Sequence, residues 1–96
     1  MTYKKHIKNV RGRKHKGIFL FALTTCGWCQ RTKGLLDELG VEYNYVDVDL
    51  LNEEEQDEVI RILEDYDADA SFPKTIIDEN FVISGFDEEE IRRVLE

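Results

Sequence analysis

The stretch FLFALTTCGWCQRTKGLLDELG, residues 19–40, places two cysteines between an apolar run and a helical repeat. Residues 17–23 are continuously apolar, with aromatic and branched side chains, which is typical of a strand buried on both faces. Apolar positions three and four residues apart predict a helix over Gly27–Leu39, and Gly40 stands where a left-handed cap ends such a helix. Cys26 therefore falls at the start of a helix, directly after a central strand.

A second strand and a second helix follow. Residues 41–49, VEYNYVDVD, alternate in polarity and predict a strand. This strand should run parallel to the first, because a helix connects the two. Asn52 with Glu55 three residues later is typical of a capped helix start, and the apolar stripe beyond it extends that helix.

The last part of the chain predicts a hairpin and a third helix. Residues 74–78 and 81–84 are strand-like runs on either side of a polar turn, and Asp87 is placed to cap a final helix. The resulting order is strand, helix, strand, helix, strand, strand, helix. We expect one α/β domain over residues 17–96, with a four-stranded mixed sheet flanked by three helices.

The charges are unevenly distributed along the chain. The formal net charge is −8, yet every acidic residue lies from Asp37 onward. Seven of the 13 Lys and Arg precede residue 17, namely Lys4, Lys5, Lys8, Arg11, Arg13, Lys14 and Lys16. We interpret residues 1–16 as a flexible basic arm attached to an acidic domain. An acidic domain argues against general nucleic-acid binding, although the arm leaves open a contact with RNA, an acidic lipid surface or an acidic protein.

No segment of the sequence is long and apolar enough to cross a membrane. The basic start and the apolar run before Cys26 invite comparison with a secretory signal, but cleavage there would remove the central strand. We therefore expect a cytoplasmic protein that acts as a monomer. In that compartment, two closely spaced cysteines indicate redox or metal chemistry rather than a structural disulfide.

Two thiols one helical turn apart at a helix start have the geometry of a redox pair. Unpaired N–H groups and the positive end of the helix dipole favour a thiolate at Cys26. Thiols in such motifs titrate near roughly 3.5–7.5 rather than ~8.5, so Cys26 is predicted to be the nucleophile. Cys29 is expected to be more buried and to attack the mixed disulfide at Cys26, which releases the reduced substrate.

Four residues near this pair have roles that the sequence leaves open. Lys33 and Arg31 add positive charge close to the sulfurs, but solvated helix residues are the simpler interpretation. Trp28 is interpreted as partly exposed, either contacting a partner or shielding the sulfur, with burial against a loop as an equal alternative. Pro73 is the single proline, and its spacing alone favours an ordinary trans bond at a strand start.

Over residues 17–96 the chain resembles the glutaredoxins and glutaredoxin-like redoxins, on the segments TTCGWC, VDVD, SFPKTIID and SGF in this order. The resemblance implies a thioredoxin-like fold and a thiol–disulfide oxidoreductase that carries electrons through Cys26 and Cys29. It also implies a cis bond that brings Pro73 toward Cys26. The residues implied to bind substrate are Thr25, Gly27, Trp28, Phe72, Pro73, Ser84, Gly85, Phe86 and Asp87.

The resemblance also implies how two of these segments act. The backbone of Phe72 would bind an extended substrate segment, and residues 84–87 would bind the glutamyl end of glutathione. Leu23, however, replaces a lysine that contacts the glycyl carboxylate of glutathione in most of the family. Phe72 and Ser84 also depart from the usual small or branched residue and the usual Gly-Gly.

The reductant therefore stays open. Glutathione or another low-molecular-weight thiol fits the family, whereas SGF resembles the hydrogen-donor redoxins that receive electrons from a reductase. Leu20 stands where thioredoxins carry a buried acid, which favours the glutaredoxin side of the superfamily. The preferred interpretation is a reductase of protein disulfides or glutathione mixed disulfides with no bound cofactor.

Three alternatives compete with this interpretation. A zinc site would need four ligands, and His6 and His15 lie in the basic segment outside the usual spacing. A [2Fe–2S] cluster shared by two chains is a stronger alternative, because Gly27 followed by an aromatic residue resembles the cluster-bridging glutaredoxins. A binding module without redox turnover would require both cysteines to be inert.

Overall fold

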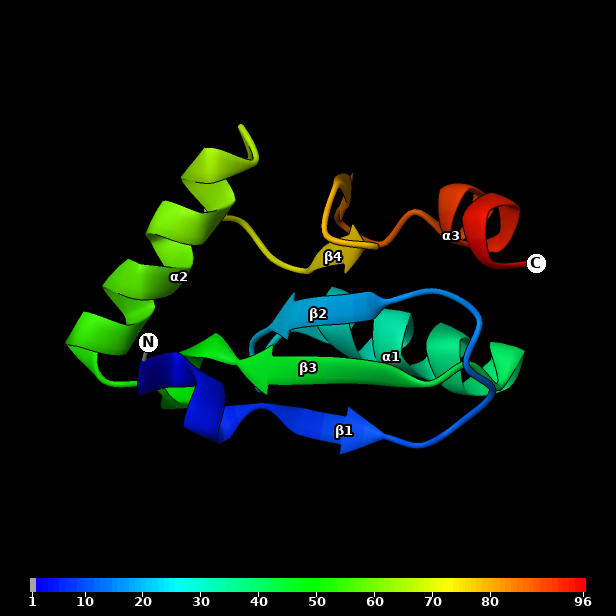
Figure 1. The fold of residues 1–96 in the computed structure, drawn as a ribbon, viewed down its shortest axis with the longest axis horizontal. Helices are drawn as coiled ribbons and strands as arrows, with labels where there is room; N and C mark the ends of the chain where they lie inside the picture. The colour runs from blue at the N-terminus through cyan, green and yellow to red at the C-terminus, as the bar shows by residue number, and fades with distance from the viewer. Residues whose placement is uncertain (1) are drawn as a thin grey trace.

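The computed structural model describes residues 2–96 and has a five-stranded mixed sheet with helices on both faces (Figure 1). The strand order is β1-β3-β2-β4-β5. The strands are β1 Lys8–Val10, β2 Ile18–Ala22, β3 Tyr43–Asp47, β4 Lys74–Ile77 and β5 Phe81–Ser84. As its apolar sequence predicts, β2 is central, parallel to β3 and antiparallel to β4.

The helices begin at the predicted caps. They are α1 Gly27–Leu39, α2 Glu53–Asp65 and α3 Glu88–Leu95, with short 3-10 helices η1 Thr2–His6 and η2 Val48–Leu50. Gly40 ends α1 in the left-handed conformation, with φ at 69°. Asn52 and Glu55 form the predicted reciprocal cap of α2. Within residues 2–96, none of these helices is long and apolar enough to span a bilayer.

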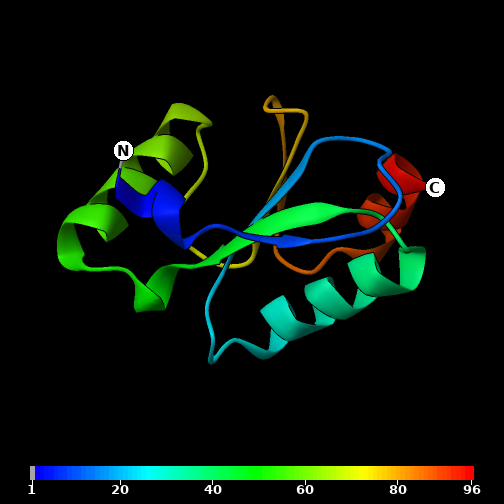
Figure 2. The same cartoon turned by 60° about the horizontal axis from the view of Figure 1, so that its bottom comes forward.

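Two apolar layers form the core, one on each face of the sheet. α1 and α3 cover one face, where Leu36 and Ile91 are fully buried. α2 and η1 cover the other face, where Val59 is fully buried (Figure 2). Leu20 belongs to the first layer and its neighbour Phe21 to the second, which is the pattern of a strand covered on both sides.

The N-terminal segment is part of the fold, which corrects the prediction of a flexible arm outside the domain. β1 pairs antiparallel with β3, so the sheet has five strands rather than four. Tyr3 on η1 is buried, and its ring centroid lies 6.4 Å from that of Phe21. The physical reason is that β1 covers a sheet edge that would otherwise expose unpaired N–H and C=O groups. Met1, which the prediction also included, lies outside the described residues.

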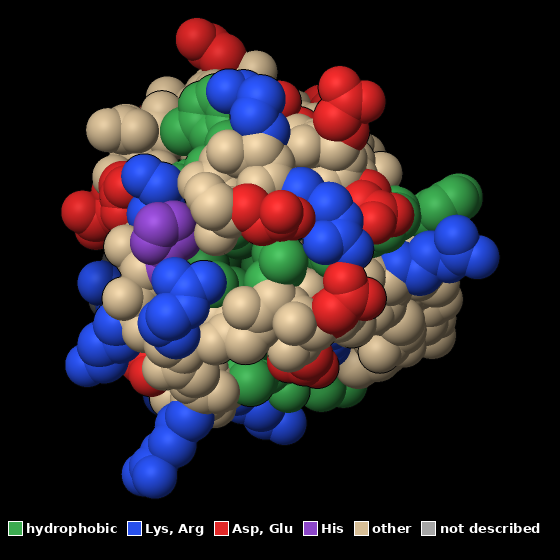
Figure 3. Space-filling model, turned by 90° about the vertical axis from the view of Figure 1, so that its right-hand side faces the viewer, with side chains coloured by type: hydrophobic (Ala, Val, Ile, Leu, Met, Phe, Trp, Pro, Cys, Tyr) green, Lys and Arg blue, Asp and Glu red, His purple; other side chains and the backbone are tan. Residues whose placement is uncertain are grey.

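The loop after β1 packs closely on the chain that follows α1. A Cβ added at Gly12 would lie 2.6 Å from the backbone carbon of Val41, so only glycine allows this approach. Arg13 N donates to Gly40 O at 2.7 Å, and Glu42 N donates to Arg13 O at 2.9 Å. The basic side chains of this loop remain exposed, and Lys and Arg project along one edge of this end of the molecule (Figure 3).

The second predicted strand is shorter than expected, because β3 ends at Asp47 and η2 follows. Asp49 leaves the sheet and accepts a hydrogen bond from Thr24 N at 2.9 Å. The hydroxyl of Thr24 donates to the same carboxylate. These bonds tie the end of β3 to the loop that leads into Cys26.

Candidate active site

Cys26 caps the helix that follows it. Residue 26 has extended backbone angles, φ −95° and ψ 113°, and is the N-cap of α1. The backbone N–H of Cys29 donates to Cys26 Sγ at 3.1 Å. Helix starts favour negative charge because their first N–H groups lack intrahelical partners and the dipole is positive there. The sulfur of Cys26 therefore lies at the positive end of the α1 dipole, at the predicted position.

Cys29 differs from Cys26 in its exposure. Its side chain is fully buried, whereas Cys26 is partly exposed, and no disulfide joins them. Burial raises the pKa of Cys29 to about 12, and a hydrogen bond with the Cys26 side chain contributes in the same direction. Cys29 therefore keeps its proton at neutral pH. The pair therefore consists of an accessible sulfur at Cys26 and a protonated, buried sulfur at Cys29.

The proline loop lies beside Cys26. The bond between Phe72 and Pro73 is cis, so the trans bond that spacing alone favours is wrong and the cis bond implied by the family resemblance is confirmed. The thiol of Cys26 lies 3.9 Å from Phe72 O. A backbone carbonyl next to the reactive sulfur is a hydrogen-bonding group that an extended substrate can reach.

The loop before α3 is bonded to the proline loop. Gly85 N donates to Pro73 O at 2.8 Å, and Gly85 has φ at 74°, in the left-handed region that favours glycine. Asp87 accepts a hydrogen bond from Glu90 N at 3.1 Å and caps α3, as predicted. The proline loop and the loop before α3, both of which the family resemblance assigns to substrate binding, are therefore neighbours.

Aromatic rings connect this second loop to the helix start. Trp28 is 58% exposed, which matches the exposed alternative rather than burial against a loop. Its ring stacks on Phe86 with centroids 6.0 Å apart and planes 19° apart. The guanidinium of Arg31 lies 5.0 Å from the Trp28 ring centroid, on the solvent side of α1. An exposed aromatic surface therefore borders the partly exposed sulfur.

Not every candidate residue touches another part of the site. Thr25 is exposed in the turn before Cys26, and Gly27 opens α1 with free space around it. The side chain of Ser84 is exposed, while its backbone pairs with Lys74 at the end of β5. The substrate contacts expected of these residues stay predictions.

Lys33 has a partner within the fold. Its ammonium lies 3.3 Å from Asp47 Oδ1 and 4.2 Å from the centroid of the Tyr45 ring. Only 16% of its side chain is exposed, so the solvated interpretation of Lys33 is wrong. Its charge acts on Cys29 in the direction that lowers the pKa, but burial outweighs it. Lys33 therefore joins α1 to the end of β3 close to the sulfurs.

Two groups near the site had no role in the sequence-based interpretation. Asp49 holds the turn before Cys26, and the hydrogen bonds from Thr24 lower the pKa of its carboxyl group. Lys74 follows Pro73 directly and is fully buried. In the sequence, the position of Asp49 at the end of VDVD and of Lys74 directly after Pro73 could have indicated these two groups. The partner of Asp49 could not be predicted, because Thr24 lies 25 residues away. The partners of Lys74, Ser71 and Asp69, lie in the loop just before it, and only the path of that loop brings them to the ammonium.

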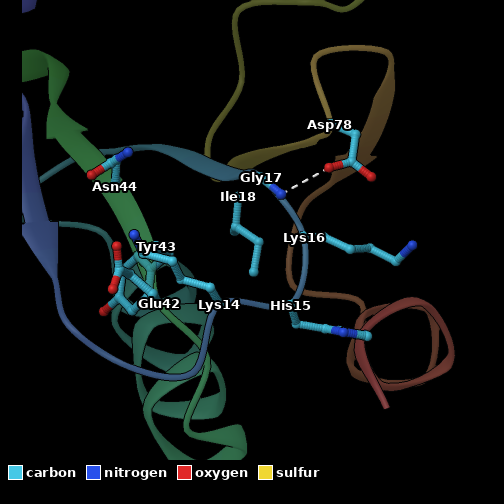
Figure 4. Close-up of a pocket in the computed structure, with 9 residues that line it drawn as sticks. All are labelled: Lys14, His15, Lys16, Gly17, Ile18, Glu42, Tyr43, Asn44 and Asp78. Atoms are coloured by element: carbon cyan, nitrogen blue, oxygen red, sulfur yellow. Dashed lines mark hydrogen bonds between the residues drawn. The ribbon is translucent and has the colours of Figure 1, made fainter.

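The described residues contain no group of three or more His, Cys, Asp or Glu side chains that could hold a metal ion. His6, weighed as a zinc ligand, has its Nε2 atom 3.3 Å from Glu55 Oε2 on α2. His15 instead lines a cavity of about 380 Å³ at the opposite end of β2 (Figure 4). The two histidines therefore lie in different parts of the fold.

That cavity combines charges of both signs. Lys14 and Lys16 line it together with Glu42 and Asp78. Gly17 N donates to Asp78 Oδ1 at 2.8 Å, as the dashed line in Figure 4 shows. With cations and carboxylates facing the same space, the cavity lacks the single-sign field that would select an anion or a cation. It also contains neither cysteine, so the thiol chemistry belongs to the other end of the sheet.

The comparisons agree with this geometry. The sequence model described as Glutaredoxin matches residues 18–82. The chain belongs to the glutaredoxin family. Glutaredoxins are generally thiol–disulfide oxidoreductases, and this member has the redox cysteine pair Cys26 and Cys29. Its fold is thioredoxin-like, with three α-helices and a five-stranded mixed sheet.

Solved glutaredoxin structures are similar over most of the chain. The glutaredoxin from Methanosarcina mazei Go1 is 39% identical with a TM-score of 0.84, covering 94% of this chain and 87% of that one. The methanoredoxin of Methanosarcina acetivorans is 43% identical with a TM-score of 0.82, covering 88% of each chain. A glutaredoxin from Archaeoglobus fulgidus is 25% identical with a TM-score of 0.77, covering 84% of this chain and 87% of that one. No curated protein sequence matched the chain.

Proposed function

We propose that this glutaredoxin reduces disulfides in proteins, or mixed disulfides between proteins and glutathione, with Cys26 as the nucleophile and Cys29 as the resolving thiol. The observation that carries the proposal is the pairing of an N-cap sulfur, which accepts the Cys29 N–H at 3.1 Å, with a fully buried thiol one turn later. Only the first sulfur is accessible to a substrate. The second is protected until the first has reacted.

The proposed reaction has two exchange steps. The Cys26 thiolate attacks one sulfur of the substrate disulfide, a Cys26–substrate bond forms, and the other substrate sulfur leaves and takes up a proton. Cys29 then loses its proton and attacks Cys26 Sγ, which expels the second substrate sulfur as a thiol. Two electrons pass to the substrate, and Cys26 and Cys29 are left as a disulfide.

Substrate binding in this proposal uses the groups around Cys26. The carbonyl of Phe72, 3.9 Å from the sulfur, supports docking of an extended segment through backbone hydrogen bonds. The stacked rings of Trp28 and Phe86 offer apolar area beside it. A disulfide within a flexible protein segment fits such a surface.

We further propose that a low-molecular-weight thiol such as glutathione, or a reductase, returns the two electrons. The protein would work as a monomer in the cytoplasm, with disulfide-containing proteins as its partners. The loop of Gly85 and the cap at Asp87 would receive the glutamyl end of glutathione. A comparison of recycling by glutathione and by a flavin-linked reductase, each with the same disulfide substrate, decides between the donors.

The roles of the two cysteines are tested with serine variants. We expect Cys26→Ser to lose all acceleration of insulin reduction by dithiothreitol over the uncatalysed rate, because the attacking sulfur is gone. Cys29→Ser should instead accumulate a covalent mixed disulfide with the substrate, visible on a non-reducing gel. Gln30→Ser is the control, because it changes an exposed residue of α1 that has no proposed role in substrate binding.

Two results would contradict the assignment. Insulin reduction by Cys26→Ser at the wild-type rate would exclude residue 26 as the nucleophile. A brown protein after anaerobic purification, with iron and sulfide in equal amounts, would instead favour the cluster-bridging dimer, since a dithiol has no visible absorbance.

A further inference from the structure

Lys74, the first residue of β4, is buried without any exposure. Lysine is almost never fully buried unless its ammonium is paired, because water solvates that charge strongly. Lys74 lies opposite Phe21 on β2 and Ser84 on β5, so its backbone is fixed on both sides within the sheet. The ammonium of Lys74 is thus fixed next to the proline loop and shielded from water, so it needs hydrogen-bond acceptors within the protein.

The ammonium of Lys74 binds three oxygen atoms of the preceding loop. It donates to Ser71 O and to Ser71 Oγ, each at 2.7 Å, and lies 2.7 Å from Asp69 Oδ1. Ser71 N and Oγ also donate to that carboxylate oxygen, at 3.3 and 2.7 Å. An ammonium has three N–H groups, so these acceptors match its full donor capacity.

The bonds from Lys74 lower the pKa of the Asp69 carboxyl group to about 2, with further contributions from Ser71. The carboxylate is therefore ionised at every pH at which the protein would work. Its side chain is 77% exposed, so the loop meets water on one side and the buried ammonium on the other.

The segment held in this way ends at Phe72. The ammonium fixes the carbonyl of Ser71, one peptide unit before the carbonyl that lies 3.9 Å from Cys26 Sγ. On the other side, Pro73 O is held by Gly85 N at 2.8 Å. Phe72 therefore lies between two anchored residues, and the anchor on its N-terminal side is Lys74.

We propose that Lys74 is a positioning residue that holds the backbone of Phe72 at Cys26 and thereby sets how strongly an extended, disulfide-bearing protein segment binds. The inference rests on the proposed function and adds a residue that the sulfur chemistry alone does not require. Lys74 touches neither the sulfurs nor the proposed substrate. It acts through the loop of residues 69–72.

A purely structural role would be served better by an apolar side chain. Well-packed apolar replacements of buried ion pairs are often neutral or stabilising, and removing Lys74 leaves Asp69 in water rather than as a buried unpaired charge. Lys74→Met is therefore expected to fold. The loop of residues 69–72 would then lose its three bonds to the ammonium of Lys74. The backbone of Phe72 would become mobile next to Cys26 Sγ.

The test compares Lys74→Met with Thr75→Val, a matched change at the next buried position of the same strand. Thr75 Oγ1 has no hydrogen-bond partner among the described residues, so the isosteric valine removes nothing that the loop uses. Three rates are measured. Reduction of insulin and of bis(2-hydroxyethyl) disulfide is followed with dithiothreitol as reductant, and alkylation of Cys26 by iodoacetamide is followed on reduced protein after the dithiothreitol has been removed.

We expect Lys74→Met to raise the KM for insulin by ~10-fold, because displaced binding groups lower affinity for the extended substrate. Reduction of the small disulfide and alkylation should stay within ~2-fold of wild type, since neither reagent is long enough to bind along the Phe72 backbone. Thr75→Val should leave all three rates unchanged. This split between a long and a short substrate is not expected from a general loss of structure.

An unchanged KM for insulin in Lys74→Met, or an equal loss of all three rates, overturns the positioning role while the proposed function stands. If Lys74→Met does not fold, Asp69→Asn weakens the same anchor from the exposed side and should raise the KM by ~3-fold. No change in that variant would likewise overturn the inference. A wild-type protein that reduces neither disulfide would contradict the proposed function, and the positioning role with it.

Discussion

At the residue scale, burial gives the two cysteine side chains different chemical properties. Both cysteines belong to one helical turn, yet only Cys29 is closed off from water. Burial raises its pKa to about 12 because the thiolate form loses its hydration. A thiolate is the nucleophile in disulfide exchange, so the second step of the proposed reaction must await loss of that proton.

We expect the rate of the resolving step to rise with pH. Starting from Cys26 bridged to a small thiol, only Cys29 has to ionise, and below its raised pKa the thiolate fraction grows ~10-fold per pH unit. The logarithm of the rate of thiol release should therefore increase with a slope near one from pH 6 to pH 9. Stopped-flow fluorescence of the exposed Trp28 follows the step. A rate that levels off near pH 7 would show that Cys29 ionises far more easily than its burial implies.

At the scale of elements, the start of α2 is held by a reciprocal cap. Glu55 N donates to Asn52 Oδ1 at 2.8 Å, and Asn52 N donates to Glu55 Oε1 at 2.9 Å. The other carboxylate oxygen of Glu55 lies 3.3 Å from His6 Nε2. One buried glutamate thus joins the helix start to η1. The cap was predicted from the sequence, but the contact with His6 was not.

Asn52→Ala should lower the free energy of unfolding by about 1 kcal/mol, because it removes the side-chain acceptor for Glu55 N. Asn52→Gly is the control, since glycine tolerates the N-cap conformation and is expected to cost only a few tenths of a kcal/mol. Urea unfolding followed by circular dichroism measures both. Equal stability of Asn52→Ala and the wild type would mean that this cap does not contribute to the fold.

At the scale of the whole molecule, the N-terminal segment closes one side of the core. Tyr3 packs against Phe21 beneath α2, and Thr2 Oγ1 donates to Glu58 on that helix at 2.8 Å. β1 continues this attachment along the edge of β3. The basic N-terminal segment is therefore attached to the domain by the buried ring of Tyr3 and by the backbone pairing of β1 with β3. Its lysine side chains remain at the surface.

Tyr3→Ala should destabilise the protein by about 2 kcal/mol, somewhat less than a fully central aromatic residue, because the chain end can relax around the cavity. Lys4→Ala, at an exposed position of the same 3-10 helix, should leave the free energy of unfolding unchanged. Urea titration of the two variants gives the comparison. If both behave like the wild type, the segment is dispensable, as the sequence-based interpretation of a flexible arm held.

Local sequence patterns predicted most of the helices and strands, and the strand that they missed has a physical explanation. The apolar run of β2, the repeat of α1 and the caps of α2 and α3 each act within a few residues, so the sequence shows them directly. β1 was missed because Lys8 and Asn9 are polar and their side chains are exposed. Its place in the sheet depends on pairing with β3, far along the chain.

The candidate site divides in the same way. The spacing of Cys26 and Cys29 and the helix that follows them predict a redox pair without any knowledge of the fold. The partners of Lys33 and Lys74, by contrast, could not be inferred, and both were found in segments brought close only by folding or by loop closure. Family resemblance supplied the cis bond at Pro73, against the expectation from spacing alone.

The sequence by itself determined the order of helices and strands from residue 17 onward, the helix-start location of Cys26 and the turn between the two sulfurs, because capping and periodicity are short-range effects. The tertiary structure decided which sulfur is shielded, which carbonyl faces Cys26 and how the basic N-terminal segment is attached. Those properties depend on burial and on contacts such as that between Cys26 and Phe72, 46 residues apart, which no local pattern encodes.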